Sequence, residues 1–109
     1  MGELEDFVAR LDGFEWDAAN SDKNWLRHEV RQAEAEQALL NTPRVIEADL
    51  KHSGAEPRFI ALGQTDVGRL LAVVFTTRGT RIRVISARAM SKAERKVYGQ
   101  AESDSEADS

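Results

Sequence analysis

Residues 69–88, RLLAVVFTTRGTRIRVISAR, decide the fold of this 109-residue chain. Two runs rich in β-branched and apolar residues, 69–77 and 81–88, flank the turn-forming pair at 78–79, which is typical of a β-hairpin. A further apolar run at 58–63 is followed by a turn at 66–68. Residues 58–88 therefore predict a three-stranded antiparallel meander.

Shorter elements precede and follow the meander. Residues 14–17 alternate apolar and charged side chains like a short strand. Two helices are expected after it, one from about residue 18 and one over 33–40, where Pro43 prevents continuation. Residues 91–94, Ser-Lys-Ala-Glu, match a capping box, so a C-terminal helix is expected to run to about residue 100.

The chain is expected to form one α+β domain, because a core of this size buries only about two-thirds of the unfolded surface. We expect a small antiparallel sheet, made of the short first strand and the meander, packed with two or three helices. Residues 44–49 add a short extended segment. Residues 1–13 are expected to form a helical extension, 14–100 the folded domain, and 101–109 a disordered acidic tail.

Charge is segregated along the sequence. Residues 58–98 contain nine Lys or Arg against two acids, although the whole chain has a net charge of −4. Such segregation favours binding of an anion by the basic segment, and phosphate is the commonest biological anion.

Composition excludes several classes of protein. The chain has no cysteine and two histidines, so thiolate metal sites are excluded and a zinc site is not expected. No metal or cofactor is needed to explain the sequence. The longest apolar run, 70–75, is far shorter than the roughly 20 residues that span a bilayer, and the N-terminus lacks a signal-peptide pattern. A cytoplasmic protein without membrane contact is expected.

The arginines of the meander are the candidate anion ligands. A single strand arginine is most often a solvated edge residue or the partner of an acid such as Glu56. A cluster is harder to dismiss, since planar guanidinium groups donate two parallel hydrogen bonds to phosphate. Strict alternation in the last strand puts Arg83 and Arg88 on opposite faces. The expected patch consists of Arg58, Arg78, Arg83, Arg88 and, on the next helix, Arg95.

A group that moves a proton is also needed, because arginine does not act as a base. Histidine is the residue type that titrates near neutral pH, and His28 shares a predicted helix face with Asn24, next to Arg27. The alternative is that His28 is an ordinary surface residue, as a lone helix histidine most often is. For Trp16 and Trp25 the alternatives are core packing and a surface on which a base stacks.

Several ordered motifs resemble the BrnT toxin family. They cover residues 14 to about 98 and read Phe14-Glu15-Trp16-Asp17, Asn24-Trp25-Leu26-Arg27-His28, His52-Ser53, residues 56–63 EPRFIALG, Gly68-Arg69-Leu70-Leu71, residues 74–79 VFTTRG, residues 81–88 RIRVISAR, Glu94-Arg95 and Tyr98. The family usually has Lys-His-Gly where this chain has Arg27-His28-Glu29.

The resemblance implies a ribonuclease toxin of a type II toxin–antitoxin pair with a fold related to the RelE toxins. It also implies an antitoxin of the BrnA kind that neutralises the toxin and through which DNA would be reached indirectly. The positions that match the polar motifs are residues 24–28, Arg58, residues 76–78, Arg83 and residues 86–88.

The resulting hypothesis is a metal-independent endoribonuclease in which a ribose 2′-hydroxyl attacks the adjacent phosphate. In it His28 moves the proton, and Arg58, Arg78 and Arg83 stabilise the transition state. The expected substrate-binding residues are Trp16, Asn24, Arg27, Thr76, Ser86 and Arg88. The alternative is a degenerate, non-catalytic homologue that binds an antitoxin or nucleic acid, which the departure at Arg27 and Glu29 favours.

Overall fold

A curved five-stranded sheet carries one helix on its concave side and a second helix at one end. The computed structural model describes residues 13–16, 25, 27–49, 54 and 56–107. The elements are β1 (Phe14–Glu15), α3 (Gln32–Leu40), β2 (Val45–Ala48), β3 (Arg58–Gln64), β4 (Leu70–Arg78), β5 (Arg81–Ala89) and α4 (Lys92–Ala107).

The predicted meander is confirmed by the antiparallel pairs β3–β4 and β4–β5. The hairpin between β4 and β5 closes with Gly79 and Thr80, and Gly79 has φ +60°, as the first position of a type II′ turn requires. The short extended segment is confirmed as β2, an antiparallel edge strand beside β3. The α+β class is therefore confirmed.

Two features of the fold differ from the expectation. The sheet is mixed rather than antiparallel, because β1 pairs in parallel with β5, with Phe14 opposite Ile82 and Glu15 opposite Arg83. The C-terminal helix does not stop near residue 100, since α4 continues to Ala107 through part of the segment expected to be a disordered tail. Ala and Glu, which recur in residues 101–107, are strong helix formers and favour this continuation.

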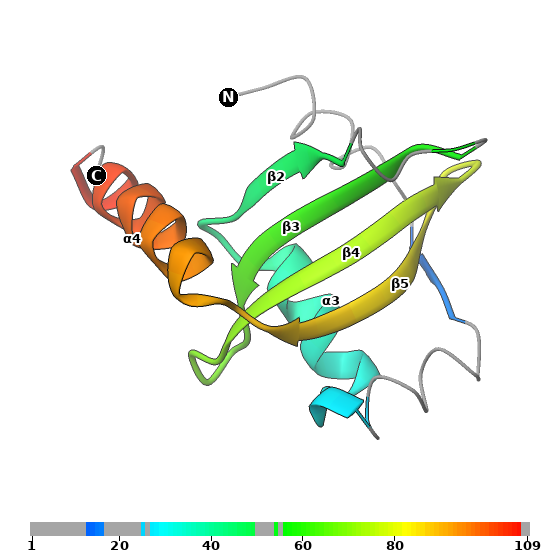
Figure 1. Ribbon diagram of the computed structural model, residues 1–109, viewed down its shortest axis with the longest axis horizontal. Helices are drawn as coiled ribbons and strands as arrows, with labels where there is room; N and C mark the ends of the chain where they lie inside the picture. Colours follow the sequence, from blue (N-terminus) through cyan, green and yellow to red (C-terminus); the bar gives the residue numbers. More distant parts are fainter. Residues whose placement is uncertain (1–12, 17–24, 26, 50–53, 55, 108–109) are drawn as a thin grey trace.

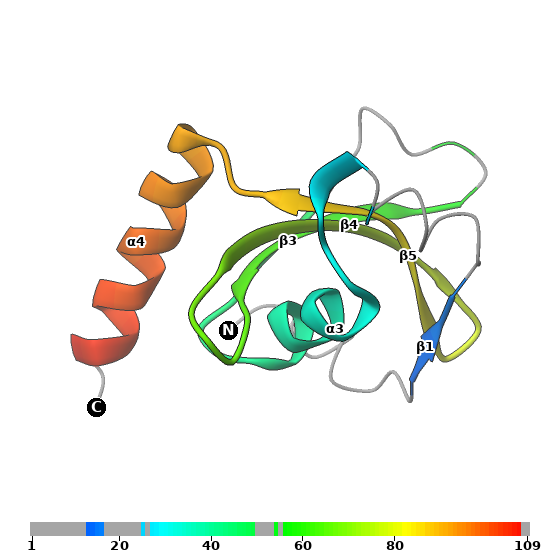
Figure 2. The same cartoon turned by 90° about the horizontal axis from the view of Figure 1, so that it is seen from below.

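The predicted helix at 33–40 is confirmed as α3. The expected N-terminal helix and the first part of the helix from residue 18 lie outside the described residues. Trp25, Arg27 and His28 are helical, and we call this short segment the His28 turn. Figure 2 shows that it rises beside β5 on the side of the sheet away from α3.

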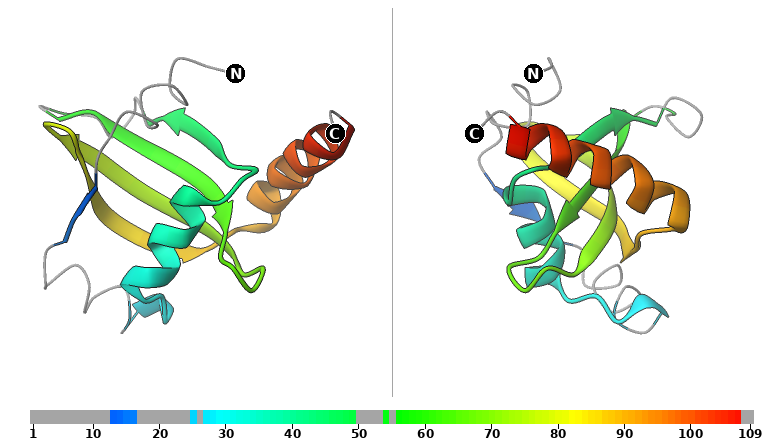
Figure 3. Two further views of the ribbon diagram at one scale, coloured as in Figure 1. Left: turned by 180° about the vertical axis from the view of Figure 1, so that it is seen from behind. Right: turned by 90° about the vertical axis from the view of Figure 1, so that its left-hand side faces the viewer.

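The core lies between α3 and the inner face of the sheet (Figure 3, left). Its buried side chains include Leu39 of α3 and Phe59, Val73, Phe75 and Val84 of the strands. Close approach of helix and sheet is possible because β3 has glycine at position 63: a Cβ atom there would lie 2.0 Å from the Ala38 carbonyl oxygen.

The opposite face, which we call the outer face, is only partly covered. The N-terminal half of α4 packs at one end of it, where Leu62, Ala72, Met90 and Tyr98 form a second apolar cluster. The Tyr98 hydroxyl donates a 2.7 Å hydrogen bond to the Pro43 carbonyl oxygen, which ties α4 to the loop before β2. The remainder of the outer face lies between α4 and the β4–β5 hairpin. No helix in the described part of the chain is long and apolar enough to cross a membrane.

Candidate functional site

A β-bulge in β5 determines which polar side chains share the outer face. Val74 pairs with Ser86 but the next residue of β4, Phe75, pairs with Val84, so Ile85 is the extra residue. The alternation of faces therefore shifts by one position within β5. The expectation that Arg83 and Arg88 lie on opposite faces is wrong, because strict alternation does not hold across a bulge.

Arg88 is held by three hydrogen bonds at the α4 end of the outer face. Its Nη1 and Nη2 atoms lie 2.6 and 2.9 Å from the two carboxylate oxygens of Glu94, and Nη1 also donates to the Ala89 carbonyl oxygen at 3.2 Å. These three bonds use three of the five guanidinium N–H groups. The remaining two are of the kind that binds a phosphate oxygen.

Glu94 links this arginine to the start of α4. Its Oε1 atom accepts the Ser91 backbone N–H at 2.8 Å, and the Ser91 hydroxyl accepts the Glu94 backbone N–H at 3.2 Å. The predicted capping box is thus confirmed. The hydrogen bond from Arg88 lowers the pKa of Glu94 to about 2, against an opposing effect of burial and with help from the Ser91 bonds. Glu94 is therefore a carboxylate at neutral pH.

A second basic group lies at the hairpin end of the sheet. Thr76 of β4 pairs with Arg58 on one side and with Arg83 on the other, which puts the three residues in one row across neighbouring strands. Thr76 itself is buried, and its hydroxyl donates to the Pro57 carbonyl oxygen. It therefore serves the local backbone rather than offering an exposed hydroxyl to a substrate.

Carboxylates accompany the arginines of the hairpin end. The Oε1 atom of Glu15 lies 3.5 Å from Nη1 of Arg83 and 3.8 Å from Nη1 of Arg78. Nη2 of Arg78 lies 3.5 Å from Oε1 of Glu56, the partner that the sequence indicated. These separations are longer than those at Arg88, and the Glu15, Glu56 and Arg78 side chains are 40% or more exposed. Such pairs exchange readily with other ligands.

Arg69 fixes the backbone of the His28 turn. Its Nη2 atom donates to the His28 carbonyl oxygen at 3.2 Å and its Nη1 atom to the Glu29 carbonyl oxygen at 2.8 Å. The same Nη1 lies 2.9 Å from Glu34 of α3. Burial alone would raise the pKa of Glu34, but hydrogen bonds from the Arg31 backbone and from Arg69 lower it. Arg69 is not among the site residues predicted from the sequence, because its contacts are to backbone carbonyl oxygens far away in the sequence.

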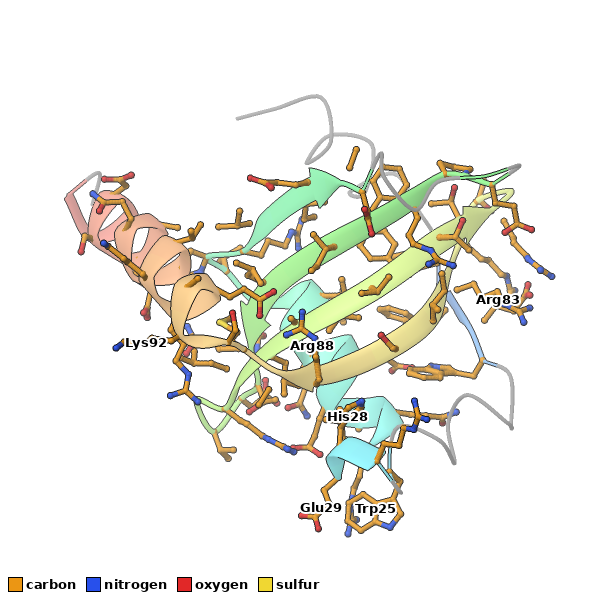
Figure 4. The ribbon with its side chains drawn as sticks, in the orientation of Figure 1. Trp25, His28, Glu29, Arg83, Arg88 and Lys92 are labelled. Atoms are coloured by element: carbon orange, nitrogen blue, oxygen red, sulfur yellow. The ribbon has the colours of Figure 1, made fainter. Side chains whose placement is uncertain are left out.

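The turn ends at a residue in the left-handed region. Glu29 has φ +52°, and its N–H donates to the Trp25 carbonyl oxygen at 2.9 Å, as in a C-terminal helix cap. Glycine is the residue that best adopts this conformation. The glycine that the family usually has at position 29 would therefore suit the backbone conformation there. Figure 4 shows the Glu29 side chain pointing away from the sheet.

The structure does not gather the predicted catalytic residues into one centre. Arg69, which binds the backbone of His28, directly precedes β4, whereas Arg78 is the last residue of that nine-residue strand. A strand of this length spans about 25–30 Å. Figure 4 shows His28 on the Arg88 side and Arg83 toward the other end of β5. His28 thus belongs with Arg88, apart from the hairpin arginines.

The two tryptophans occupy different environments. Trp16 packs against the inner core, and its indole N–H donates to Oε2 of Glu36 at 2.7 Å, so we remove it from the substrate-binding set. Trp25 is 45% exposed, with the Arg31 guanidinium 4.9 Å from its ring centroid. Trp25 is the better candidate for stacking on a base. Arg27 is exposed and Ser86 half-buried, whereas Asn24 lies outside the described residues.

The fold and this outer face define a class: small α+β proteins with several arginines on one face of the sheet. The family model described as "Ribonuclease toxin, BrnT, of type II toxin-antitoxin system" matches residues 16–94. The chain belongs to this family.

A solved structure gives the same picture of the fold. The chain resembles the 1.1 Å crystal structure of the Brucella abortus ribonuclease toxin BrnT, with a TM-score of 0.53 and 24% sequence identity. The alignment covers 73% of this chain and 97% of that one. A comparison with curated proteins found no match.

Proposed function

We propose that this chain is a cytoplasmic endoribonuclease that cleaves RNA without a metal ion. In the proposed reaction a ribose 2′-oxygen bonds to the adjacent phosphorus and the bond to the 5′-oxygen breaks. The products are a 2′,3′-cyclic phosphate and a 5′-hydroxyl. Membership of a ribonuclease toxin family supports RNA as the substrate.

One observation supports the assignment of residues: the bulge at Ile85 brings Arg83, Ser86 and Arg88 to one face of the sheet, and His28 lies on the Arg88 side of that face (Figure 4). In the proposal, His28 accepts or donates the proton and Arg88 binds the reacting phosphate through its remaining N–H groups. The hairpin arginines, Arg58, Arg78 and Arg83, then bind further phosphates of the same strand, and at Arg78 and Arg83 the phosphate replaces Glu15 and Glu56. Arg27 and Trp25 contact the RNA near the turn.

A type II toxin family implies an antitoxin partner, and in this proposal that antitoxin is of the BrnA kind. An acidic or amphipathic segment of the antitoxin would occupy the outer-face arginines and so exclude RNA. DNA would be bound by the antitoxin and not by this chain.

The test is cleavage of RNA by the purified chain in EDTA. His28→Ala is expected to lower the cleavage rate by about 10²–10⁴ while circular dichroism shows the fold intact. His52→Ala, the other histidine variant, shows whether the loss is specific to position 28. Unchanged cleavage by His28→Ala would remove that residue from the mechanism.

A non-catalytic homologue is the second candidate, and the carboxylates beside Arg78, Arg83 and Arg88 favour it. These acids already neutralise much of the charge that a substrate would meet. Induction of the chain in a bacterium separates the two candidates. Growth arrest that co-expression of the antitoxin relieves supports the toxin, and harmless overexpression supports the non-catalytic homologue.

A further inference from the structure

An open apolar pocket adjoins Arg88 on the outer face. It has a volume of about 290 Å³ and is lined by residues of β2, β3 and the first turns of α4. This volume is at the lower end of the roughly 300–1,000 Å³ typical of small-ligand sites. The described residues that line it are Val45, Glu47, Ile60, Leu62, Ala93, Glu94 and Val97.

The strand register explains the apolar walls. Val45 pairs with Leu62 and Glu47 with Ile60, so all four project from the outer face of the two strands. On the opposite side, α4 presents the small side chain of Ala93 and leaves Val97 49% exposed. Tyr98 anchors α4 through its bond to the loop before β2, which holds the walls apart.

The pocket and the proposed active site share one residue, Glu94. Glu94 forms part of the pocket wall, and the same carboxylate holds Arg88 through bonds of 2.6 and 2.9 Å. A phosphate on the remaining N–H groups of Arg88 would therefore place the attached nucleotide next to the pocket. A planar base could enter it and stack against aliphatic side chains.

The polar groups of the pocket define which base fits. Of the described lining residues, only Glu47 and Glu94 carry polar side chains, and the oxygens of Glu94 already accept bonds from Arg88 and Ser91. Glu47 is exposed on the edge strand β2. An ionised carboxylate only accepts hydrogen bonds, so its complement is a base with adjacent N–H donors. Guanine alone presents two such donors, N1–H and N2–H, side by side on its Watson–Crick edge.

We infer that this pocket is a base-recognition subsite that selects guanine next to the scissile phosphate, with Glu47 as the specificity-determining residue. The inference rests on the proposed ribonuclease function. The competing occupant is an apolar side chain or helix of the antitoxin, which the experiment below distinguishes.

The test uses short oligouridines that carry one central G, A, C or U and in which every ribose is 2′-O-methylated, so that no linkage can be cleaved. Fluorescence anisotropy is expected to give an affinity for the G oligonucleotide about 10- to 100-fold higher than for the other three, as one bidentate pair provides. Glu47→Gln is expected to reduce this preference to less than about threefold. Glu102→Gln, which removes one carboxylate outside the pocket lining, is the charge-matched control and should keep the preference.

A second variant tests the pocket independently in case Glu47→Gln does not fold. Ala93→Phe fills the pocket and should also abolish the preference for guanine, while circular dichroism confirms the fold. Equal affinity of the wild type for all four oligonucleotides would overturn the inference. So would Ala93→Phe blocking antitoxin binding while leaving the preference intact, since the pocket would then belong to the antitoxin.

Failure of the subsite and failure of the proposed function give different results. The oligonucleotides are not cleaved, so base preference is measured whether or not the chain is catalytic. Cleavage of ordinary RNA without any base preference would refute the subsite and leave the ribonuclease assignment standing. Selective binding of guanine without cleavage of ordinary RNA would refute the ribonuclease assignment and leave the subsite standing.

Discussion

The pair Arg88–Glu94 gives the sharpest prediction about stability. Glu94→Gln keeps the shape of the side chain and one oxygen acceptor but removes the charge that Arg88 binds. The pKa of Glu94 falls from 4.5 to about 2 in the folded chain, which sets a ceiling of roughly 3 kcal/mol for the stabilisation. The Arg88 side chain is 37% exposed, so solvent screens the pair. We expect the free energy of unfolding to fall by about 1–2 kcal/mol at pH 7.

The pH dependence of this loss separates charge from shape. Because the folded-state pKa is lower than the unfolded-state value, the carboxylate stabilises the fold fully above about pH 4.5 and loses this effect as the pH falls through about 2. Urea unfolding followed by tryptophan fluorescence should therefore show the deficit at pH 7 shrinking to less than about half at pH 3. Glu102→Gln on the same helix is the control. An equal deficit at both pH values would refute the electrostatic reasoning, because a packing defect does not titrate.

Three backbone positions give further predictions. Glu29→Gly should raise the free energy of unfolding by roughly 0.5–1 kcal/mol, because glycine relieves the strain of the left-handed conformation at φ +52° by more than its entropy cost. Thermal unfolding measures this change. An equal rise in the free energy of unfolding for Glu29→Ala would contradict this reason. Gly63→Ala should cost more than about 2 kcal/mol, since its Cβ would meet the Ala38 oxygen at 2.0 Å. Gly99→Ala, whose Cβ meets nothing within 4 Å, should instead stabilise α4 in the same urea titration.

The local elements could be predicted because their signals are local. Alternation and turn residues locate β3, β4 and β5, and the proline after α3 marks where that helix ends. The parallel pairing of β1 with β5 has no such signal, since two residues pair with a strand almost 70 positions away. The bulge at Ile85 also has no sequence signal, because no glycine or proline accompanies it. Yet it decides the face on which Arg88 lies.

In the candidate site, too, some features have a local sequence signal and others depend on tertiary contacts. Residue type was enough to nominate the arginines and His28 as candidates, because few side chains bind phosphate or transfer protons near neutrality, and their roles stay predictions. Their partners depend on tertiary contacts. Glu15 reaches Arg83 only through the β1–β5 pairing, and Arg69 reaches the His28 turn only through its position before β4.

The contrast between the two groups of arginines gives a physical reason why the proposed RNA binding is compatible with an acidic chain. Arg88 is bound by Glu94 at hydrogen-bonding distance, so a carboxylate orients it without using all of its donors. Arg78 and Arg83 lie 3.5–3.8 Å from exposed carboxylates, and such pairs are worth little against a phosphate. The first arrangement fixes the orientation of the Arg88 guanidinium, and the second allows Arg78 and Arg83 to exchange a carboxylate for a phosphate. Geometry is what a reacting phosphate requires, whereas exchange suits the remaining phosphates of the strand, which must be released after each cleavage.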